Sequence, residues 1–222
     1  MESNEARESA DTYPATVHVV AATDDRNRLT VAFRFFLALP HWILVGGPVA
    51  SMASAAMEEG HGWGWGSSGG LIGAVAWACA VFAWFAIVFT GKHPDGLWKM
   101  GAYYLRWRYR ALAYLTLLRD EYPPFGEGEY PVEVTLPEPA SERDRVTVLF
   151  RVVLAIPHLI LLGLLGIAWG FTTAIAWIVI LFTGRYPDSL YGFALGVLAW
   201  QLRVETYLLL LRDEYPPFSL RT

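Results

Sequence analysis

The chain has 222 residues, of which 55% are hydrophobic and 17% are charged, and its formal net charge is −4. Soluble globular domains carry about 25% charged residues, so this composition argues against a soluble protein. The acidic balance also leaves no basic surface for a nucleic-acid partner.

The first segment, residues 1–12, is polar and acidic. It lacks the basic start and the apolar stretch of a signal peptide. We therefore expect a disordered tail on the cytoplasmic side of a membrane, with the first helix of the chain acting as the insertion signal.

Two long stretches carry no charged residue. Residues 69–90 form one uncharged run of 22 residues, and residues 152–184 form another of 33 residues. The hydrocarbon core of a bilayer is about 30 Å thick and needs about 20 such residues per helix. Both runs are long enough, and they predict an integral membrane protein.

The chain contains two tandem copies of one unit, because three motifs recur in the same order. They are RLTVAFRFFLALPH at 28–41 and RVTVLFRVVLAIPH at 145–158, FTGKHPDGL at 89–97 and FTGRYPDSL at 182–190, and LLRDEYPPF at 117–125 and 210–218. We assign the first repeat to residues 13–125 and the second to residues 130–218. The offset between copies is 117 residues at the front and 93 at the back, so the first copy carries an insertion of 24 residues, near 46–70.

These three motifs resemble those of a family of unknown function, DUF4389. The resemblance covers nearly the whole chain twice and leaves out the N-terminal tail and the insertion. It implies a bacterial membrane protein, here of the cytoplasmic (inner) membrane, and it implies no particular chemistry.

We expect three helices in each copy, at 29–57, 69–90 and 95–118 in the first and at 146–165, 167–183 and 188–211 in the second. The first two helices of each copy are predicted to form a transmembrane hairpin, with a tight turn near 163–170 in the second copy. The Tyr-Pro stretches at 13–20 and 130–136 alternate in polarity and are predicted to pair as short cytoplasmic strands.

The third helix of each copy decides the topology. In the first copy its polar stripe includes Lys99, Arg106 and Arg110, which is typical of an amphipathic helix lying in the membrane interface. Arg108 falls on the opposite face, and in the second copy only Gln201, Arg203 and Glu205 break the apolar run, so the third helix of that copy could instead dip into the bilayer or pack against the hairpins. Lys and Arg of short loops favour the cytoplasmic side, and the predicted outer loops 46–70 and 163–170 hold neither residue. We therefore predict an all-α, multi-pass protein with four transmembrane helices in two hairpins, two interfacial helices and a cytoplasmic N-terminus.

Two aspartates follow a proline where the third helices begin. The side chains of Asp95 and Asp188 are predicted to be helix N-caps, which accept backbone N–H bonds worth about 1 kcal/mol.

Arg34 and His41 recur as Arg151 and His158, near the cytoplasmic ends of the first helices. Seven residues are close to two helical turns, so the arginine and histidine share a face in each copy. The arginines either snorkel to lipid phosphates or bind a ligand. The histidines either donate to a carbonyl freed by the preceding proline or together ligate a haem iron. No Cys, Asp or Glu accompanies them at this depth, so we predict no zinc or di-iron site.

The basic residues Arg106, Arg110 and Arg203, and with them Arg108, lie beside aromatic residues and are candidates for binding anionic lipid headgroups. The carboxylates of the Arg-Asp-Glu-Tyr-Pro-Pro-Phe motif are expected to pair with neighbouring arginines or to stay in water. The sequence contains no glycine-rich phosphate loop, His-Glu-x-x-His motif or Gly-x-Ser-x-Gly motif, so we expect no enzyme.

The leading functional hypothesis is a non-enzymatic accessory or scaffold subunit that binds membrane lipids and a protein partner, or forms a homo-oligomer. The alternatives are an oligomeric transporter or channel component and, more weakly, a bis-histidine haem protein using His41 and His158.

Overall fold

The computed structural model describes residues 13–47, 69–138 and 143–221. Within these ranges the chain is mostly helical and has one two-stranded sheet. The elements are β1 (Thr16–Val19), α2 (Arg28–Val45), α4 (Gly70–Thr90), α5 (Asp95–Leu115), β2 (Val132–Thr135), α6 (Arg145–Thr183) and α7 (Asp188–Leu208).

The first two predicted helices of the second copy are one continuous helix. α6 has 39 residues, and at 1.5 Å per residue it is about 58 Å long. The predicted turn at 163–170 is therefore wrong, and with it the second transmembrane hairpin. These residues are apolar and contain no proline, and a glycine inside a helix costs only about 1 kcal/mol, so nothing ends the helix there.

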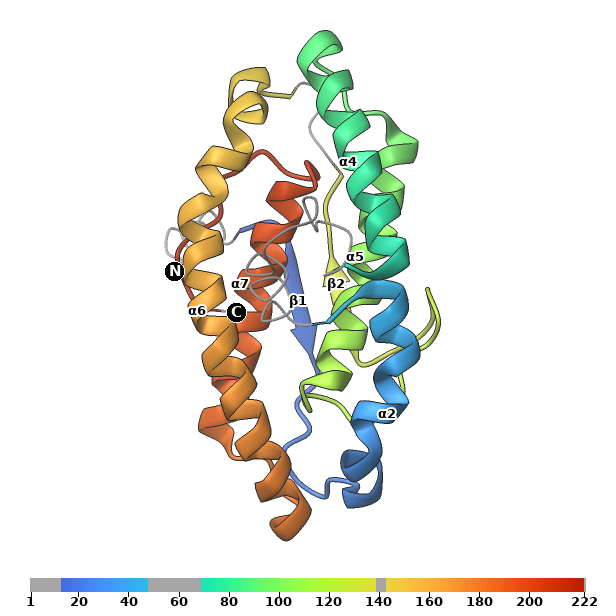
Figure 1. Cartoon of the computed structure of the whole chain (residues 1–222), viewed down its shortest axis with the longest axis vertical. Helices are drawn as coiled ribbons and strands as arrows, with labels where there is room; N and C mark the ends of the chain where they lie inside the picture. The colour runs from blue at the N-terminus through green and yellow to red at the C-terminus, as the bar shows by residue number, and fades with distance from the viewer. Residues whose placement is uncertain (1–12, 48–68, 139–142, 222) are drawn as a thin grey trace, which may run out of the picture.

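The first copy follows the same path in two pieces. α2 ends at Val45, earlier than the predicted boundary at 57, and α4 begins at Gly70. The two ends touch, because a side chain added at Gly70 would place its Cβ 2.5 Å from the carbonyl carbon of Leu44. Most of the predicted outer loop, residues 48–68, lies outside the described residues. In Figure 1, α2 and α4 together run along one side of the molecule, opposite α6.

The two long paths are antiparallel and are joined at both ends by equivalent hydrogen bonds. The indole Nε1 of Trp177 in α6 donates to the carbonyl of Val31 in α2 at 2.9 Å. The Nε1 of Trp84 in α4 donates to the carbonyl of Val148 in α6 at 3.1 Å. Because each pair occupies equivalent positions of the repeat, the copies are related by a pseudo-twofold axis.

The third helices, α5 and α7, are not surface helices as predicted. Of the 21 residues in each, 12 are buried in α5 and 15 in α7. α5 packs against α2 and α4, α7 packs against α6, and the sheet packs against both α5 and α7. Both faces of these helices are thus covered by other elements, which their polar stripe did not indicate.

The predicted pairing of the two Tyr-Pro stretches is confirmed. β1 and β2 are antiparallel, with Val17 opposite Val134. β1 packs against α7 and β2 against α5, so each strand covers the helix of the other copy. This exchange ties the two copies together on the side away from α6.

The predicted N-caps Asp95 and Asp188 are wrong. The caps are the preceding residues, Pro94 and Pro187, and neither aspartate makes a side-chain capping hydrogen bond. Proline has a φ suited to a helix start and needs no N–H partner there, so the proline is the cap and the aspartate is the first helical residue. Both aspartates lie in the first turn, where the helix dipole still favours a negative charge.

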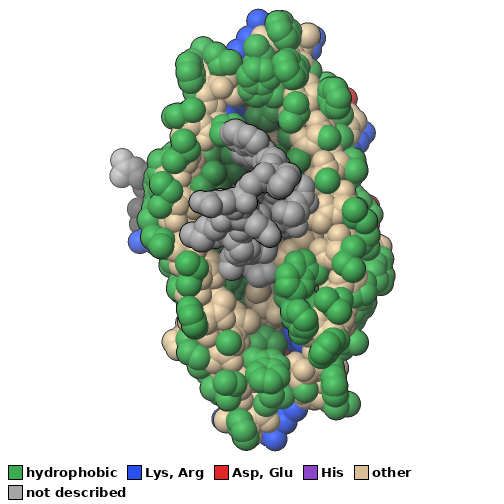
Figure 2. Space-filling view, in the orientation of Figure 1, with side chains coloured by type: hydrophobic (Ala, Val, Ile, Leu, Met, Phe, Trp, Pro, Cys, Tyr) green, Lys and Arg blue, Asp and Glu red, His purple; other side chains and the backbone are tan. Residues whose placement is uncertain are grey.

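Large apolar side chains that are exposed gather on the long helices. Of 35 such side chains among the described residues, 29 belong to α2, α4 or α6 and none to α5 or α7. Figure 2 shows them covering both long paths on one face of the molecule. These three helices are long and apolar enough to cross a membrane, which supports membrane association.

The continuous helix makes a testable prediction at its glycines. A Cβ at Gly163 or Gly170 meets no atom within 4 Å, so Gly163→Ala and Gly170→Ala should each stabilise the protein by up to about 1 kcal/mol. Thermal unfolding in detergent, followed by circular dichroism, measures this change. Gly184→Ala is the control and should destabilise the protein, because Gly184 has a φ of 74°. Destabilisation at 163 and 170 would instead indicate a turn.

Candidate functional site

The repeated arginine of the first copy lies inside the protein. The side chain of Arg34 is only 2% exposed. Its Nη1 donates to the carbonyls of Tyr114 and Arg119 at 3.2 and 2.8 Å, and its guanidinium lies 4.6 Å from the centre of the Tyr114 ring. The snorkelling interpretation is wrong, because carbonyls at the end of α5 bind the guanidinium in place of lipid phosphates.

Asp120 provides the countercharge for two arginines. It accepts from Nη2 of Arg34 and, at 2.8 Å, from Nε of Arg26. Burial opposes ionisation of Asp120, but the hydrogen bonds and charges of Arg26 and Arg34 outweigh burial and hold the pKa of its carboxyl below the usual value. The aspartate of the closing motif is therefore an ionised bridge between the two arginines.

The same arrangement recurs in the second copy. Arg151 pairs with Asp213 at 2.6 Å, and Arg143 pairs with the same carboxylate at 2.9 Å. The Nη1 of Arg151 donates to the carbonyls of Tyr207 and Arg212. We call the two arrangements the arginine clasps, formed by Arg26, Arg34 and Asp120 and by Arg143, Arg151 and Asp213.

Each clasp also uses a leucine in the left-handed conformation. Leu117 has φ 70° and Leu210 has φ 63°. Their carbonyls accept from Nη2 of Arg26 and Arg143. Because this conformation costs a non-glycine residue about 1–2 kcal/mol, the clasp stabilises a backbone turn that is otherwise unfavourable.

The histidines share the predicted face with the arginines but contact only their own copy. The Nδ1 of His41 accepts from the indole Nε1 of Trp107 at 3.0 Å, and that of His158 accepts from Trp200 at 3.1 Å. The aromatic rings of the closing motif cover them: Phe125 stacks on His41 at 4.5 Å, and Phe218 on His158 at 3.9 Å.

These hydrogen bonds bear on the haem hypothesis. Indole Nε1 is only a donor, so Nδ1 of each histidine is unprotonated and Nε2 carries the proton of the neutral ring. Neither nitrogen then keeps a free lone pair for iron. No group of three or more His, Cys, Asp or Glu suited to a metal ion occurs in the described part of the chain. The geometry gives the hypothesis no support, and it stays a prediction.

The remaining carboxylates of the closing motif pair with arginine, as expected. Glu121 pairs with Arg119, and Glu214 with Arg212. The clasps themselves were not predicted from the sequence. The available signal was that the arginine–histidine motif and the closing motif occur together in both copies.

One buried ion pair is not repeated. Arg108 of α5 donates through Nε to Glu205 of α7 at 3.0 Å and through Nη1 and Nη2 to the carbonyls of Val45 and Gly47. Those carbonyls are free because the insertion interrupts the long helix after α2. In the second copy α6 continues without a break, and the residue equivalent to Arg108 is Gln201. The sequence placed Arg108 off the polar stripe and, with three other arginines, among the candidates for headgroup binding; for Arg108 that prediction is wrong, because its side chain is buried against Glu205.

The other three candidate lipid-binding arginines lie against the segments that follow the third helices. Arg106 faces Glu127 at 3.6 Å, Arg110 donates to the carbonyl of Gly126 at 3.4 Å, and Arg203 donates to that of Ser219 at 2.6 Å. None of them lines the cavity described below. The structure therefore does not bring them together with Arg34 or Arg151 at one site.

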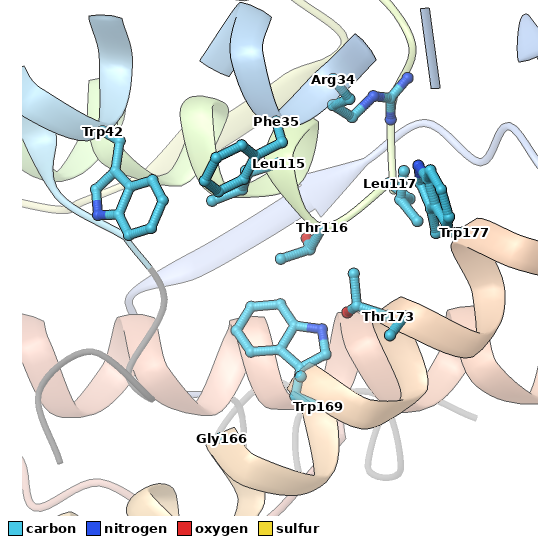
Figure 3. Close-up of a pocket in the computed structure, with 12 residues that line it drawn as sticks. Arg34, Phe35, Trp42, Leu115, Thr116, Leu117, Gly166, Trp169, Thr173 and Trp177 are labelled. Atoms are coloured by element: carbon cyan, nitrogen blue, oxygen red, sulfur yellow. The ribbon is translucent and has the colours of Figure 1, made fainter. Parts of the chain in front are cut away.

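A cavity of about 580 Å³ lies between α2, the C-terminal end of α5 and α6 (Figure 3). Its walls are mainly apolar and include four aromatic residues, Phe35, Trp42, Trp169 and Trp177. Polar groups enter it from Arg34, Thr116 and Thr173. Figure 3 shows Trp169 and Thr173 projecting from α6 toward Thr116. This cavity has the size and lining of a small-molecule site.

Comparison with known proteins identifies a family without an assigned activity. The model of the family "Domain of unknown function (DUF4389)" matches residues 69–126 and 145–219. The two segments fall one in each copy, so the resemblance seen in the sequence is confirmed and is consistent with two tandem copies. No curated protein and no solved structure matches the chain.

Removing the shared carboxylate should destabilise the first copy. Asp120→Asn leaves Arg26 and Arg34 buried without a countercharge, and we expect a loss of about 3 kcal/mol at pH 7. Because the pKa of Asp120 is lowered on folding, its contribution is complete above the unfolded pKa of about 3.9 and is lost as the pH falls through the folded value. Chemical unfolding in detergent at pH 7 and pH 3 should show the difference from wild type shrinking in acid.

The matched control for Asp120→Asn is Glu121→Gln. The Glu121 side chain is 53% exposed, so its ion pair is worth under about 1 kcal/mol. Equal effects of the two changes would contradict the role of the clasp.

The Arg108–Glu205 ion pair, which has no equivalent in the other copy, should contribute a large coupling energy to the free energy of unfolding. Arg108→Gln introduces the residue of the second copy but leaves Glu205 buried without a partner, and we expect a loss of about 3–5 kcal/mol. Adding Glu205→Gln should restore much of the stability, and a double-mutant cycle of unfolding free energies measures the coupling. Arg106→Gln, at a half-exposed position, is the control. Strictly additive effects would exclude a direct Arg108–Glu205 interaction.

Proposed function

This chain belongs to the DUF4389 family, whose description assigns no activity, and we propose that it is a non-enzymatic accessory or scaffold protein of the bacterial cytoplasmic membrane. In this proposal α2, α4 and α6 lie within one leaflet and contact lipid. The opposite, charged face is cytoplasmic and binds a protein partner.

The main support for this proposal is that exposed apolar side chains cluster on the layer formed by α2, α4 and α6. α6 is buried only along one stripe, so most of its circumference is exposed. Moving a large apolar side chain from water into an apolar phase is worth about 1.5–3 kcal/mol, and 29 such side chains lie on these helices. A surface of this kind is far more stable in lipid than in water.

The length of α6 favours an orientation in the plane of the membrane. The helix is about 58 Å long, whereas the hydrocarbon core is about 30 Å thick. An upright helix would leave nearly half of its apolar length outside the core. A helix parallel to the membrane plane keeps its whole length in the apolar phase.

Charges on the sheet side support the same orientation. Glu133 of β2 is exposed, and Glu127 is 64% exposed. β2 crosses the middle of the molecule along its long axis (Figure 1). An upright molecule would place Glu133 near the centre of the bilayer, at a cost of about 3 kcal/mol. With the long axis in the plane, these carboxylates face water.

The distribution of Lys and Arg supports a cytoplasmic location for this face. Arg26 and Arg185 lie at one end of the long helices, and Lys92 and Arg145 lie at the other. In an upright molecule these two groups would face opposite sides of the membrane, against the usual cytoplasmic bias of basic residues. In the plane, all of them lie at the same surface.

The use of the repeated polar residues supports a role without catalysis. Arg34, His41 and Asp120 each bind other residues of their own copy, as do their equivalents in the second copy. The polar groups that remain exposed on the sheet side, such as Glu127 and Glu133, are available to a protein partner. A second copy of this chain is the alternative partner.

Cysteine labelling in membrane vesicles tests the orientation. In a Cys79→Ala background, single cysteines replace Lys92, Arg185 or Gly163, and right-side-out and inside-out vesicles are treated with an impermeant maleimide. We expect 92 and 185 to react only from the cytoplasmic side and 163 to react from neither side. Glu133→Cys, on the sheet, is the control for accessible positions.

Other labelling patterns would contradict the proposal. An upright long axis predicts that 92 and 185 react from opposite sides, and a hairpin predicts that 163 reacts from outside. Turnover by the purified protein alone, lost on changing His41 or His158, would refute the non-enzymatic role.

A further inference from the structure

We propose that the cavity between α2 and α6 binds one membrane-soluble molecule and that Trp169 and Thr173 of α6 donate hydrogen bonds to a carbonyl oxygen of that molecule. The inference rests on the proposed function, because an apolar ligand reaches this cavity from the lipid around α2 and α6. It adds a defined site and a ligand chemistry to the general lipid contact proposed above.

Three polar atoms at the cavity are buried without a hydrogen-bond partner among the described residues. They are Nε of Arg34, Nε1 of Trp169 and Oγ1 of Thr173. Arg34 is 2% exposed and Trp169 is 1% exposed. Buried polar atoms are nearly always paired in proteins, so these atoms indicate a missing partner. Because the nitrogens of arginine and tryptophan only donate, the partner must supply an acceptor oxygen.

The acceptor fits a neutral carbonyl better than a phosphate. Phosphate is usually held by several donors or by the two-pronged face of a guanidinium. In Arg34 both terminal nitrogens already bind Asp120 and the carbonyls of Tyr114 and Arg119. Asp120 also balances the charge of the guanidinium, so Arg34 offers no free two-pronged face to a phosphate. The indole N–H of Trp169 and the hydroxyl of Thr173, one turn apart on α6, suit a single carbonyl oxygen (Figure 3).

The walls of the cavity fit an apolar body attached to that carbonyl. Four aromatic side chains line it, and its volume of about 580 Å³ lies within the range of small-molecule sites. Two membrane components share this chemistry: a lipid with an ester carbonyl on its acyl chain, and a lipid-soluble quinone with a ring carbonyl. The experiment below distinguishes them.

The other copy shows that the two donors from α6 are not required by the repeat, whereas Arg34 recurs as Arg151, whose Nε also lacks a hydrogen-bond partner among the described residues. The positions equivalent to Trp169, Gly170 and Thr173 are Ala76, Trp77 and Ala80. Trp77 packs against the cluster formed by residues of α6 and α7, which include Leu162, Trp200 and Leu208. An indole therefore occupies the region that the glycine leaves open in the proposed site, and both donor side chains from α6 are replaced by alanine. Only one of the two equivalent places has the form of a binding site.

Native mass spectrometry of the full chain in detergent tests the proposal. A diacyl phospholipid, its ether-linked analogue without ester carbonyls, and a short-tailed benzoquinone are each titrated. We expect one saturable adduct with a carbonyl-bearing probe. Binding of the diester but not of the diether identifies the ester lipid as the ligand, and stronger binding of the benzoquinone identifies a quinone.

Two variants locate the adduct. Gly170→Trp fills the cavity with the side chain found in the other copy and should abolish the adduct, whereas Gly163→Trp adds the same ring to α6 outside the cavity and should leave it unchanged. Trp169→Phe keeps the aromatic wall but removes one donor and should weaken binding about tenfold.

Three outcomes would overturn the proposal: no saturable adduct with any probe, equal adducts in wild type and Gly170→Trp, or no effect of Trp169→Phe. Unfolding temperatures of all variants establish that each is folded. Ligand binding in detergent micelles does not depend on how the protein is oriented in a membrane. Failure to detect an adduct would therefore not contradict the vesicle-labelling result, and an unexpected labelling pattern would not contradict ligand binding.

Discussion

A guanidinium buried within a mainly apolar helix is the constraint on which each copy depends. Arg34 and Arg151 lie on α2 and α6 with almost no exposure, and a buried charge without a partner is strongly destabilising. The countercharge comes from an aspartate that follows the third helix. To deliver it, the chain must turn back immediately after α5 or α7.

The conformation of the closing motif follows from this requirement. Leu117 and Leu210 adopt positive φ values, and their carbonyls bind Arg26 and Arg143. The prolines that follow prevent further helix, and the phenylalanine of each motif then stacks on the histidine of the long helix. One ion pair therefore determines how the third helix, the turn and the long helix pack together.

Because the clasps hold each copy independently, the rest of the repeat has been free to differ. The insertion interrupts the long helix of the first copy, and Arg108 with Glu205 binds the carbonyls that the interruption leaves free. The second difference is the cavity beside Arg34, where glycine and two donor side chains replace Ala76, Trp77 and Ala80 of the other copy. The symmetric features support the fold, and the asymmetric ones are where a specific function is expected.

The sequence by itself determined the duplication, the paired strands, the membrane-compatible helices and the shared face of arginine and histidine. These properties depend on local pattern: repeated motifs, alternation over a few residues, uncharged runs and helical spacing. The sequence misplaced the turn at 163–170, because an uncharged apolar run has the same composition whether it forms one long helix or two shorter ones. It also misplaced α5, whose polar stripe predicted a surface position, and it left open whether α7 lies at the surface or packs against the other helices. Only the tertiary structure decided which carboxylate neutralises Arg34, what Arg108 binds and where the cavity lies, because these contacts join residues from 60 to more than 130 positions apart and no local pattern specifies such partners.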